Sequence, residues 1–122
     1  MSLPTQQKLN DHLVRWNQAV GDYHQALVEF GEAKSDHEHA RAVFMVKTRH
    51  RDPSLSVSVL GMLCDADDGI FAANQRYRHA EAEVAGLRSR LDWCRAFAEG
   101  LRSEISTERA EAGLYSSDRS TP

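Results

Sequence analysis

The chain of 122 residues has a formal net charge of −3, with 41% hydrophobic and 27% charged residues. This length allows one domain at most, and a composition with only seven glycines and three prolines favours an ordered, helix-rich chain over a disordered one. No apolar run approaches the roughly 20 residues that span a bilayer, and the first residues lack the apolar core of a signal peptide. We therefore expect a cytoplasmic protein without a membrane partner.

The first predicted element is a helix over residues 5–50, bracketed by Pro4 and Pro53. Its apolar residues recur at spacings of three and four, which predicts one buried seam, with a single shortened step after Phe30 that we interpret as local overwinding. The predicted seam comprises Leu9, Leu13, Trp16, Val20, Tyr23, Leu27, Phe30, Ala33, His37, Ala40, Phe44 and Lys47. A ridge of small residues at spacing seven would let another helix approach closely: Ala19, Ala26, Ala33 and Ala40.

A short link over residues 51–65 and a second helix over residues 66–111 follow. Ser54 is the candidate cap for one apolar turn in the link, and Asp65 with Asp68 forms a capping-box-like pair at the start of the helix. Gly113 is the expected C′ residue, before a polar tail over residues 113–122. The seam of this helix alternates without a break through Ile70, Ala73, Tyr77, Ala80, Val84, Leu87, Leu91, Cys94, Ala98, Leu101 and Ile105.

Two helices of about 45 residues, each about 65–70 Å long, fold back on each other when a short link joins them, because neither can bury its seam alone. The sequence thus predicts an all-α fold: a single domain over residues 1–122, built as a long antiparallel two-helix coiled-coil hairpin. Residues whose numbers sum to roughly 117 then face each other, which places Arg41 opposite Arg76.

Cys64 and Cys94 are the only cysteines. In this hairpin they lie about 45 Å apart along a helix. A disulfide needs Cα atoms within about 7 Å, so we expect two free and unreactive thiols.

Four large apolar residues lie beside the predicted seams, where a two-helix hairpin has no interior to cover them. They are Trp93 and Phe97 on the second helix, and Val14 and Val28 on the first. Exposed apolar stripes mark interfaces, so we expect these residues to form the contacts of a homo-oligomer.

The sequence contains no constellation that would carry catalysis or bind a cofactor or metal. His37-Glu38 lacks the second histidine four residues on that a zinc-binding helix needs, and Asp65–Gly69 lacks the ligand ladder of a calcium loop. No glycine-rich phosphate loop and no nucleophile beside a base are present. We expect a protein that is not an enzyme.

The stretch Ala40–Pro53, "ARAVFMVKTRHRDP", has no acidic residue before Asp52. Its cations include Arg41, Lys47, Arg49 and Arg51, and the hairpin register adds Arg76 and Arg78 from the second helix. Such a cluster, repeated in each copy of an oligomer, suits a nucleic-acid backbone. The alternative is that these charges only solvate a helix face.

Four segments, in this order, carry a resemblance to a known family. They are "VKTR" at Val46–Arg49, which is similar to a Leu-Lys-Ala-Arg element, "LCDADDGI" at Leu63–Ile70, "LDWCRAFAEGLRSEI" at Leu91–Ile105, and Arg-Ala-Glu-Ala-Gly at residues 109–113. With these segments the chain resembles the UvsY-type recombination mediators of tailed phages.

The resemblance implies a small, helical, oligomeric protein of a bacterial host's cytoplasm that binds single-stranded DNA. It also implies two protein partners, a recombinase and the single-strand-binding protein whose covered strands the recombinase must enter. Lys47 and Arg49 are the DNA-binding residues that the resemblance implies; the other arginines come from the hairpin geometry. The alternative function is a coiled-coil adaptor that binds a protein through Trp93 and Phe97 and binds no nucleic acid.

Overall fold

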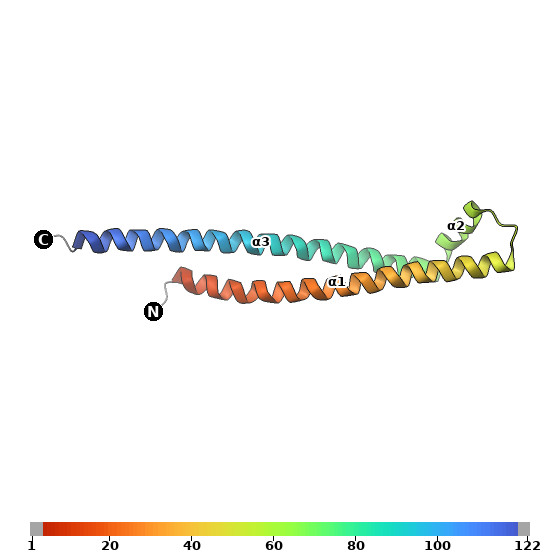
Figure 1. Ribbon diagram of the computed structural model, residues 1–122, viewed down its shortest axis with the longest axis horizontal. Helices are drawn as coiled ribbons and strands as arrows, with labels where there is room; N and C mark the ends of the chain where they lie inside the picture. Colours follow the sequence, from red (N-terminus) through yellow and green to blue (C-terminus); the bar gives the residue numbers. More distant parts are fainter. Residues whose placement is uncertain (1–3, 120–122) are drawn as a thin grey trace. The chain divides into compact units, whose positions relative to one another are not determined.

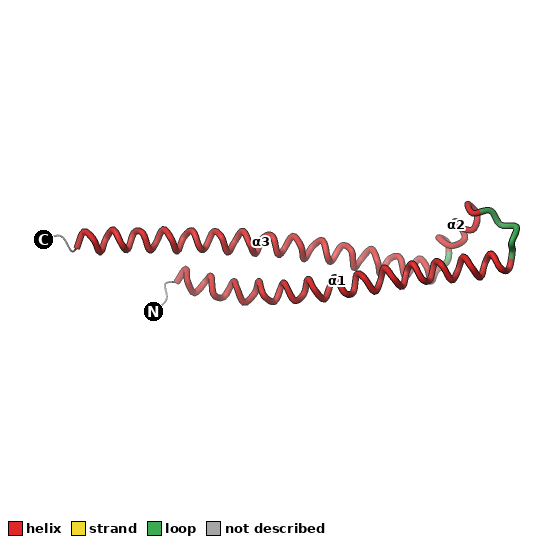
Figure 2. The backbone as a smooth tube through the Cα atoms, in the orientation of Figure 1, coloured by secondary structure: helices red, strands yellow, loops and turns green. Residues whose placement is uncertain are grey.

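The computed structural model describes residues 4–119, with side-chain exposure for residues 4–114. Three helices follow one another: α1 (Pro4–Arg51), α2 (Val57–Ala66) and α3 (Asp68–Arg119), and no strand occurs among the described residues (Figures 1 and 2). The prediction of an all-α protein is confirmed. None of these helices combines the length and the apolar character needed to cross a membrane.

The link contains a helix where the sequence predicted a single turn. Ser56 is the N-cap of α2, since its Oγ accepts a hydrogen bond from the Val59 N–H at 3.2 Å. Ser54, the predicted cap, instead donates its hydroxyl to Asp52 Oδ1 at 2.5 Å and so stabilises the turn after α1. The prediction was wrong because the apolar run after Ser56 is long enough for a helix, which buries Leu60 and Cys64 one turn apart.

Both ends of the second long helix differ from the prediction. Asp67, and not Asp65, caps α3: its Oδ2 accepts from the Ile70 N–H at 3.0 Å, because Asp65 still belongs to the last turn of α2. At the other end α3 continues through Gly113 to Arg119. No glycine among the described residues adopts the positive φ that a C′ glycine needs. Residues 120–122 of the predicted tail lie outside the described residues.

The contacts divide the chain into two compact units. Unit 1 comprises residues 1–22 and 87–122. In it the start of α1 and the later part of α3 run antiparallel, as two hydrogen bonds show: Thr5 Oγ1 donates to Glu108 Oε1 at 2.6 Å, and His12 Nε2 donates to the Cys94 carbonyl at 2.8 Å. Its core consists of Leu9, Ala98, Leu101 and Ile105, with Trp16 packed against them.

Unit 2 comprises residues 23–86: the rest of α1, all of α2 and the start of α3. The Tyr77 ring lies 5.5 Å from that of Phe30 and 5.8 Å from that of His37, so α1 and α3 are packed side by side here. Their direction is antiparallel, since Glu29 shares a groove with Glu83 and Lys47 shares one with Asp67. Arg41 forms an ion pair with Asp65 at 2.7 Å. The ion-pair partner of Arg41 thus lies at the end of α2, a helix that the hairpin prediction did not contain. Ala40, next to Arg41, lines one groove with Arg76, the residue that the predicted register placed opposite Arg41.

The predicted seam of the second helix is confirmed, since all of its residues are buried or half-buried. The seam of the first helix needs correction. Ala19 and Ala26 are 0% and 4% exposed, whereas Leu13 and Leu27 are each 36% exposed. The face of α1 that is buried or half-buried reads Leu9, His12, Trp16, Ala19, Tyr23, Ala26 and Phe30. This series alternates between spacings of three and four, so the shortened step is not needed.

Candidate nucleic-acid interface

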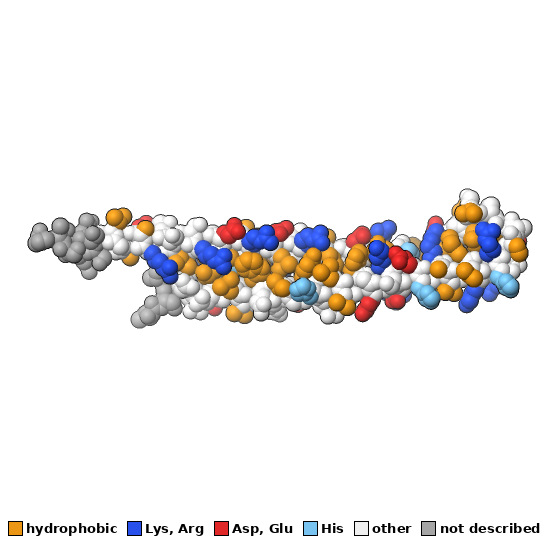
Figure 3. Space-filling view, in the orientation of Figure 1, with side chains coloured by type: hydrophobic (Ala, Val, Ile, Leu, Met, Phe, Trp, Pro, Cys, Tyr) orange, Lys and Arg blue, Asp and Glu red, His pale blue; other side chains and the backbone are white. Residues whose placement is uncertain are grey.

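The predicted basic cluster lies in unit 2, where α1 ends beside α2. Lys47, Arg49 and Arg51 are exposed there, and Arg76 is exposed on α3. Among residues 4–114, whose side chains the structure describes, no acidic group is within ion-pair distance of any of these four cations. In the space-filling view Lys and Arg side chains lie among apolar ones over α2 and the adjoining end of α1 (Figure 3). Four of the six predicted cations are thus free to meet an anion.

The other two predicted cations have acidic partners. Arg41 donates to Asp65 at 2.7 Å, and this hydrogen bond is the main reason that the pKa of Arg41 lies above its ordinary value. Arg78 lies 3.4 Å from Glu81 and 5.1 Å from the centroid of the Tyr77 ring. Both ion pairs are on the surface, where such pairs are weak, but the shorter one engages Arg41 more closely than Glu81 engages Arg78.

A structural role explains part of this cluster. Arg49, His50 and Arg51 occupy the last turn of α1, where a cation stabilises the negative end of the helix dipole by about 0.3–1 kcal/mol. Lys47 lies before that turn, and Arg76 lies in the interior of α3. The helix dipole therefore does not account for these two cations.

Lys47 and Arg76 line one shallow groove between α1 and α3. Its floor includes Ala40, Phe44 and Ala73, and Asp36 is on its wall. The other acidic residue of the groove is Asp67, whose Oδ2 already accepts the capping hydrogen bond of α3. The fold thus brings cations from two distant parts of the sequence to one open groove, a shape that suits an extended chain.

A second groove joins Arg49 and His50 to an apolar floor. Val46 and Val57, which line it, are 71% and 77% exposed. This groove could not be predicted from the sequence, because it is lined partly by α2, for which the sequence predicts a single turn.

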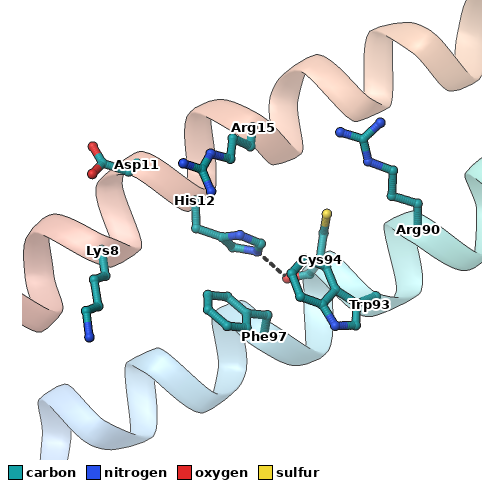
Figure 4. Close-up of a pocket in the computed structure, with 8 residues that line it drawn as sticks. All are labelled: Lys8, Asp11, His12, Arg15, Arg90, Trp93, Cys94 and Phe97. Carbon is teal, nitrogen blue, oxygen red and sulfur yellow. Dashed lines mark hydrogen bonds between the residues drawn. The ribbon is translucent and has the colours of Figure 1, made fainter.

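The four predicted interface residues are all exposed: Val14 70%, Val28 54%, Trp93 60% and Phe97 42%. That they contact another copy stays a prediction. Trp93 and Phe97 also line a pocket in unit 1 together with His12 (Figure 4). His12 was missed, although its spacing of three from Leu9 and four from Trp16 places it on the buried face of α1.

Both cysteines are free, as predicted, and both are buried. Burial is the main cause that raises the pKa of the Cys64 thiol, which leaves little thiolate to react or to bind a metal. No group of three histidine, cysteine or acidic side chains that could hold a metal ion occurs in the part of the chain that the structure describes.

Comparison with protein-family models, with curated proteins and with solved structures finds no match for this chain.

Proposed function

We propose that this protein is a non-enzymatic accessory factor of recombination that binds single-stranded DNA without sequence preference and helps to load a recombinase. The observation that carries the proposal is the set of exposed cations without acidic partners at the end of α1 and on α3: Lys47, Arg49, Arg51 and Arg76. The resemblance to UvsY-type mediators in the "VKTR" segment points to two of these four residues, Lys47 and Arg49.

The mechanism is electrostatic. Each lysine or arginine that neutralises a phosphate releases a counterion from the DNA, so binding weakens steeply as salt is added. A single strand can bend so that successive phosphates meet Lys47 and Arg76 across their groove. The fold of the protein holds these cations close enough together to contact one strand.

A set of four free cations gives weak binding alone, so the proposal includes self-association of a coiled-coil hairpin. The exposed Val14 and Val28 are candidates for that contact. An oligomer presents the cluster several times to one strand, which raises the effective affinity without new contacts. The recombinase and the single-strand-binding protein are the further partners that we propose.

The test measures fluorescence anisotropy of labelled oligo-dT with the purified protein over a range of salt, with duplex DNA as competitor. In the double variant Lys47→Ala/Arg49→Ala the slope of log affinity against log salt should fall by about 1.4, since each lost contact to a single strand contributes about 0.7. Both side chains are exposed and unpaired, so the free energy of unfolding should change by less than about 1 kcal/mol. Most of this change should come from the loss of the favourable interaction between Arg49 and the dipole of α1.

The matched control is Arg102→Ala/Arg109→Ala, which removes the same charge from two exposed positions of α3 outside the cluster. It should leave the slope nearly unchanged. A slope that falls equally in both variants would show that only net charge matters, and an unchanged slope in the first variant would refute the assignment of Lys47 and Arg49.

A second function is favoured by the apolar surface of α2. Val57, Val59, Met62 and Leu63 are between 42% and 77% exposed, and a protein partner could cover them. The protein would then be an adaptor whose cations only solvate its surface. Absence of oligo-dT binding even at low salt, together with a monomeric mass, would favour this function over the first.

A further inference from the structure

Unit 1 contains a pocket of about 220 Å³ that combines aromatic rings with cations. Figure 4 shows that α1 and α3 each contribute half of the labelled lining residues. A cavity of about 150 Å³ admits benzene, so this pocket has room for a pyrimidine ring.

The aromatic part of the pocket is partly fixed and partly open. The Trp93 ring stacks on Phe97 with centroids 5.1 Å apart and planes inclined by 23°, and Trp93 is 60% exposed. His12 lies 4.6 Å from Phe97, is 4% exposed, and is held by the hydrogen bond to the Cys94 carbonyl. Because a carbonyl only accepts, Nε2 carries the proton and the imidazole is fixed in orientation. Trp93 and Phe97 therefore rest against a rigid base and keep free ring surface.

The edge of the pocket is positive. Lys8, Arg15 and Arg90 line it, and the closest acidic group to Arg90 is Asp22 at 4.0 Å, a weak pair. Asp11 is the one acidic residue of the lining, and its Oδ1 already accepts from Gln7 Nε2 at 3.1 Å. The pocket thus offers ring surface for stacking and cations for a phosphate at the same place.

We propose that this pocket binds a base of single-stranded DNA, with the base stacked on Trp93 and Phe97 and the neighbouring phosphates held by Lys8, Arg15 and Arg90. Aromatic stacking beside cations is how single strands are bound without sequence preference. The inference rests on the proposed function and adds a contact that is separate from Lys47 and Arg49. It also reassigns Trp93 and Phe97, which the sequence analysis had given to the oligomer interface.

Charge favours DNA over a second copy of the chain as the occupant. A symmetric contact through this pocket would set Lys8, Arg15 and Arg90 near their own copies, and like charges facing each other oppose association. A phosphate backbone instead complements all three cations.

The experiment compares oligo-dT with an abasic oligonucleotide of the same length, which keeps the phosphates and lacks the bases. The protein carries Trp16→Phe, so that Trp93 is its only tryptophan. Oligo-dT should quench the Trp93 fluorescence and bind at least about fivefold more tightly than the abasic strand, and Trp93→Leu should abolish that preference. Circular dichroism confirms folding of each variant, and Leu at this exposed position keeps an apolar side chain.

The outcomes separate the two proposals. Equal affinity for both strands, with salt-sensitive binding retained, would overturn the stacking site and leave the proposed function intact. If neither strand binds at low salt, the proposed function fails and the stacking site with it. If Trp93→Leu lowers the molecular mass in solution and leaves the preference for oligo-dT unchanged, Trp93 serves self-association and the inference is wrong.

Discussion

Two leucines of α1 test which face of that helix is buried. The apolar spacing of the sequence places Leu9 and Leu27 on one seam, yet Leu9 is 7% exposed within the core of unit 1 and Leu27 is 36% exposed in unit 2. Replacing each by alanine removes the same atoms from the same kind of backbone. The two variants should therefore differ only through what surrounds the side chain.

The expected costs follow from burial. Leu9→Ala leaves a cavity against Ala98, Leu101 and Ile105, and such a change costs about 2–5 kcal/mol. Leu27→Ala loses about two-thirds of the roughly 1.5–3 kcal/mol that full burial of a leucine contributes, and it leaves no closed cavity. We expect about 1–2 kcal/mol for Leu27→Ala, part of which the higher helix propensity of alanine offsets.

Urea unfolding followed by circular dichroism at two protein concentrations measures both variants. A cost for Leu27→Ala equal to or above that for Leu9→Ala, at both concentrations, would refute the corrected seam. A cost that rises with concentration for Leu27→Ala alone would instead show that self-association covers this side of α1.

Three further predictions concern the turn after α1 and the helix α2 that follows it. Ser56→Ala should lower the stability of α2 by about 1 kcal/mol, and the amide hydrogens of that helix should then exchange faster. Ser54→Ala should leave the hydrogen exchange of α2 unchanged. The hydrogen bonds from Ser54 lower the pKa of Asp52, so their stabilisation is present above the pKa of the unfolded state and is lost as the pH falls through the folded-state value. An NMR titration of Asp52 should accordingly move to higher pH in Ser54→Ala. Burial raises the pKa of the Cys64 thiol, so iodoacetamide at neutral pH should label it slowly in the native protein and rapidly in urea, as mass spectrometry would show.

The helical content and the seam of α3 were predictable because its apolar residues recur at spacings of three and four without a break. The seam of α1 was not, since two of its buried residues are alanines and one is His12. Hydropathy ranks these below Leu13 and Leu27, which lie beside the buried face. Ala19 and Ala26 belong to the predicted ridge of small residues, and their burial confirms that another helix approaches α1 closely there. The error was to place Leu13 and Leu27 on the buried face as well.

The candidate site was predictable only in part. The exposure of Arg49 follows from its position near the end of α1, off its buried face. Lys47 was predicted on the buried seam and is exposed instead, because the half-buried residues there are Phe44 and Thr48. The ion pair between Arg41 and Asp65 could not be predicted, because it depends on where α2 ends. Because the sequence predicts only a turn where α2 forms, it misses the ion pair of Arg41. Lys47 forms no such pair with α2.

A net charge of −3 does not by itself oppose binding to DNA. At physiological ionic strength a charge acts over only about 8 Å, so a phosphate near Lys47 responds to the local side chains. Asp36 and Asp67 lie in the groove of Lys47, and Asp52 stays ionised because the hydrogen bonds from Ser54 lower its pKa, whereas Asp65 is paired with Arg41. The cations of one cluster are therefore few and partly offset by these carboxylates. Useful affinity then requires that one strand meet several such clusters, which is why self-association belongs to the proposed mechanism and is not an addition to it.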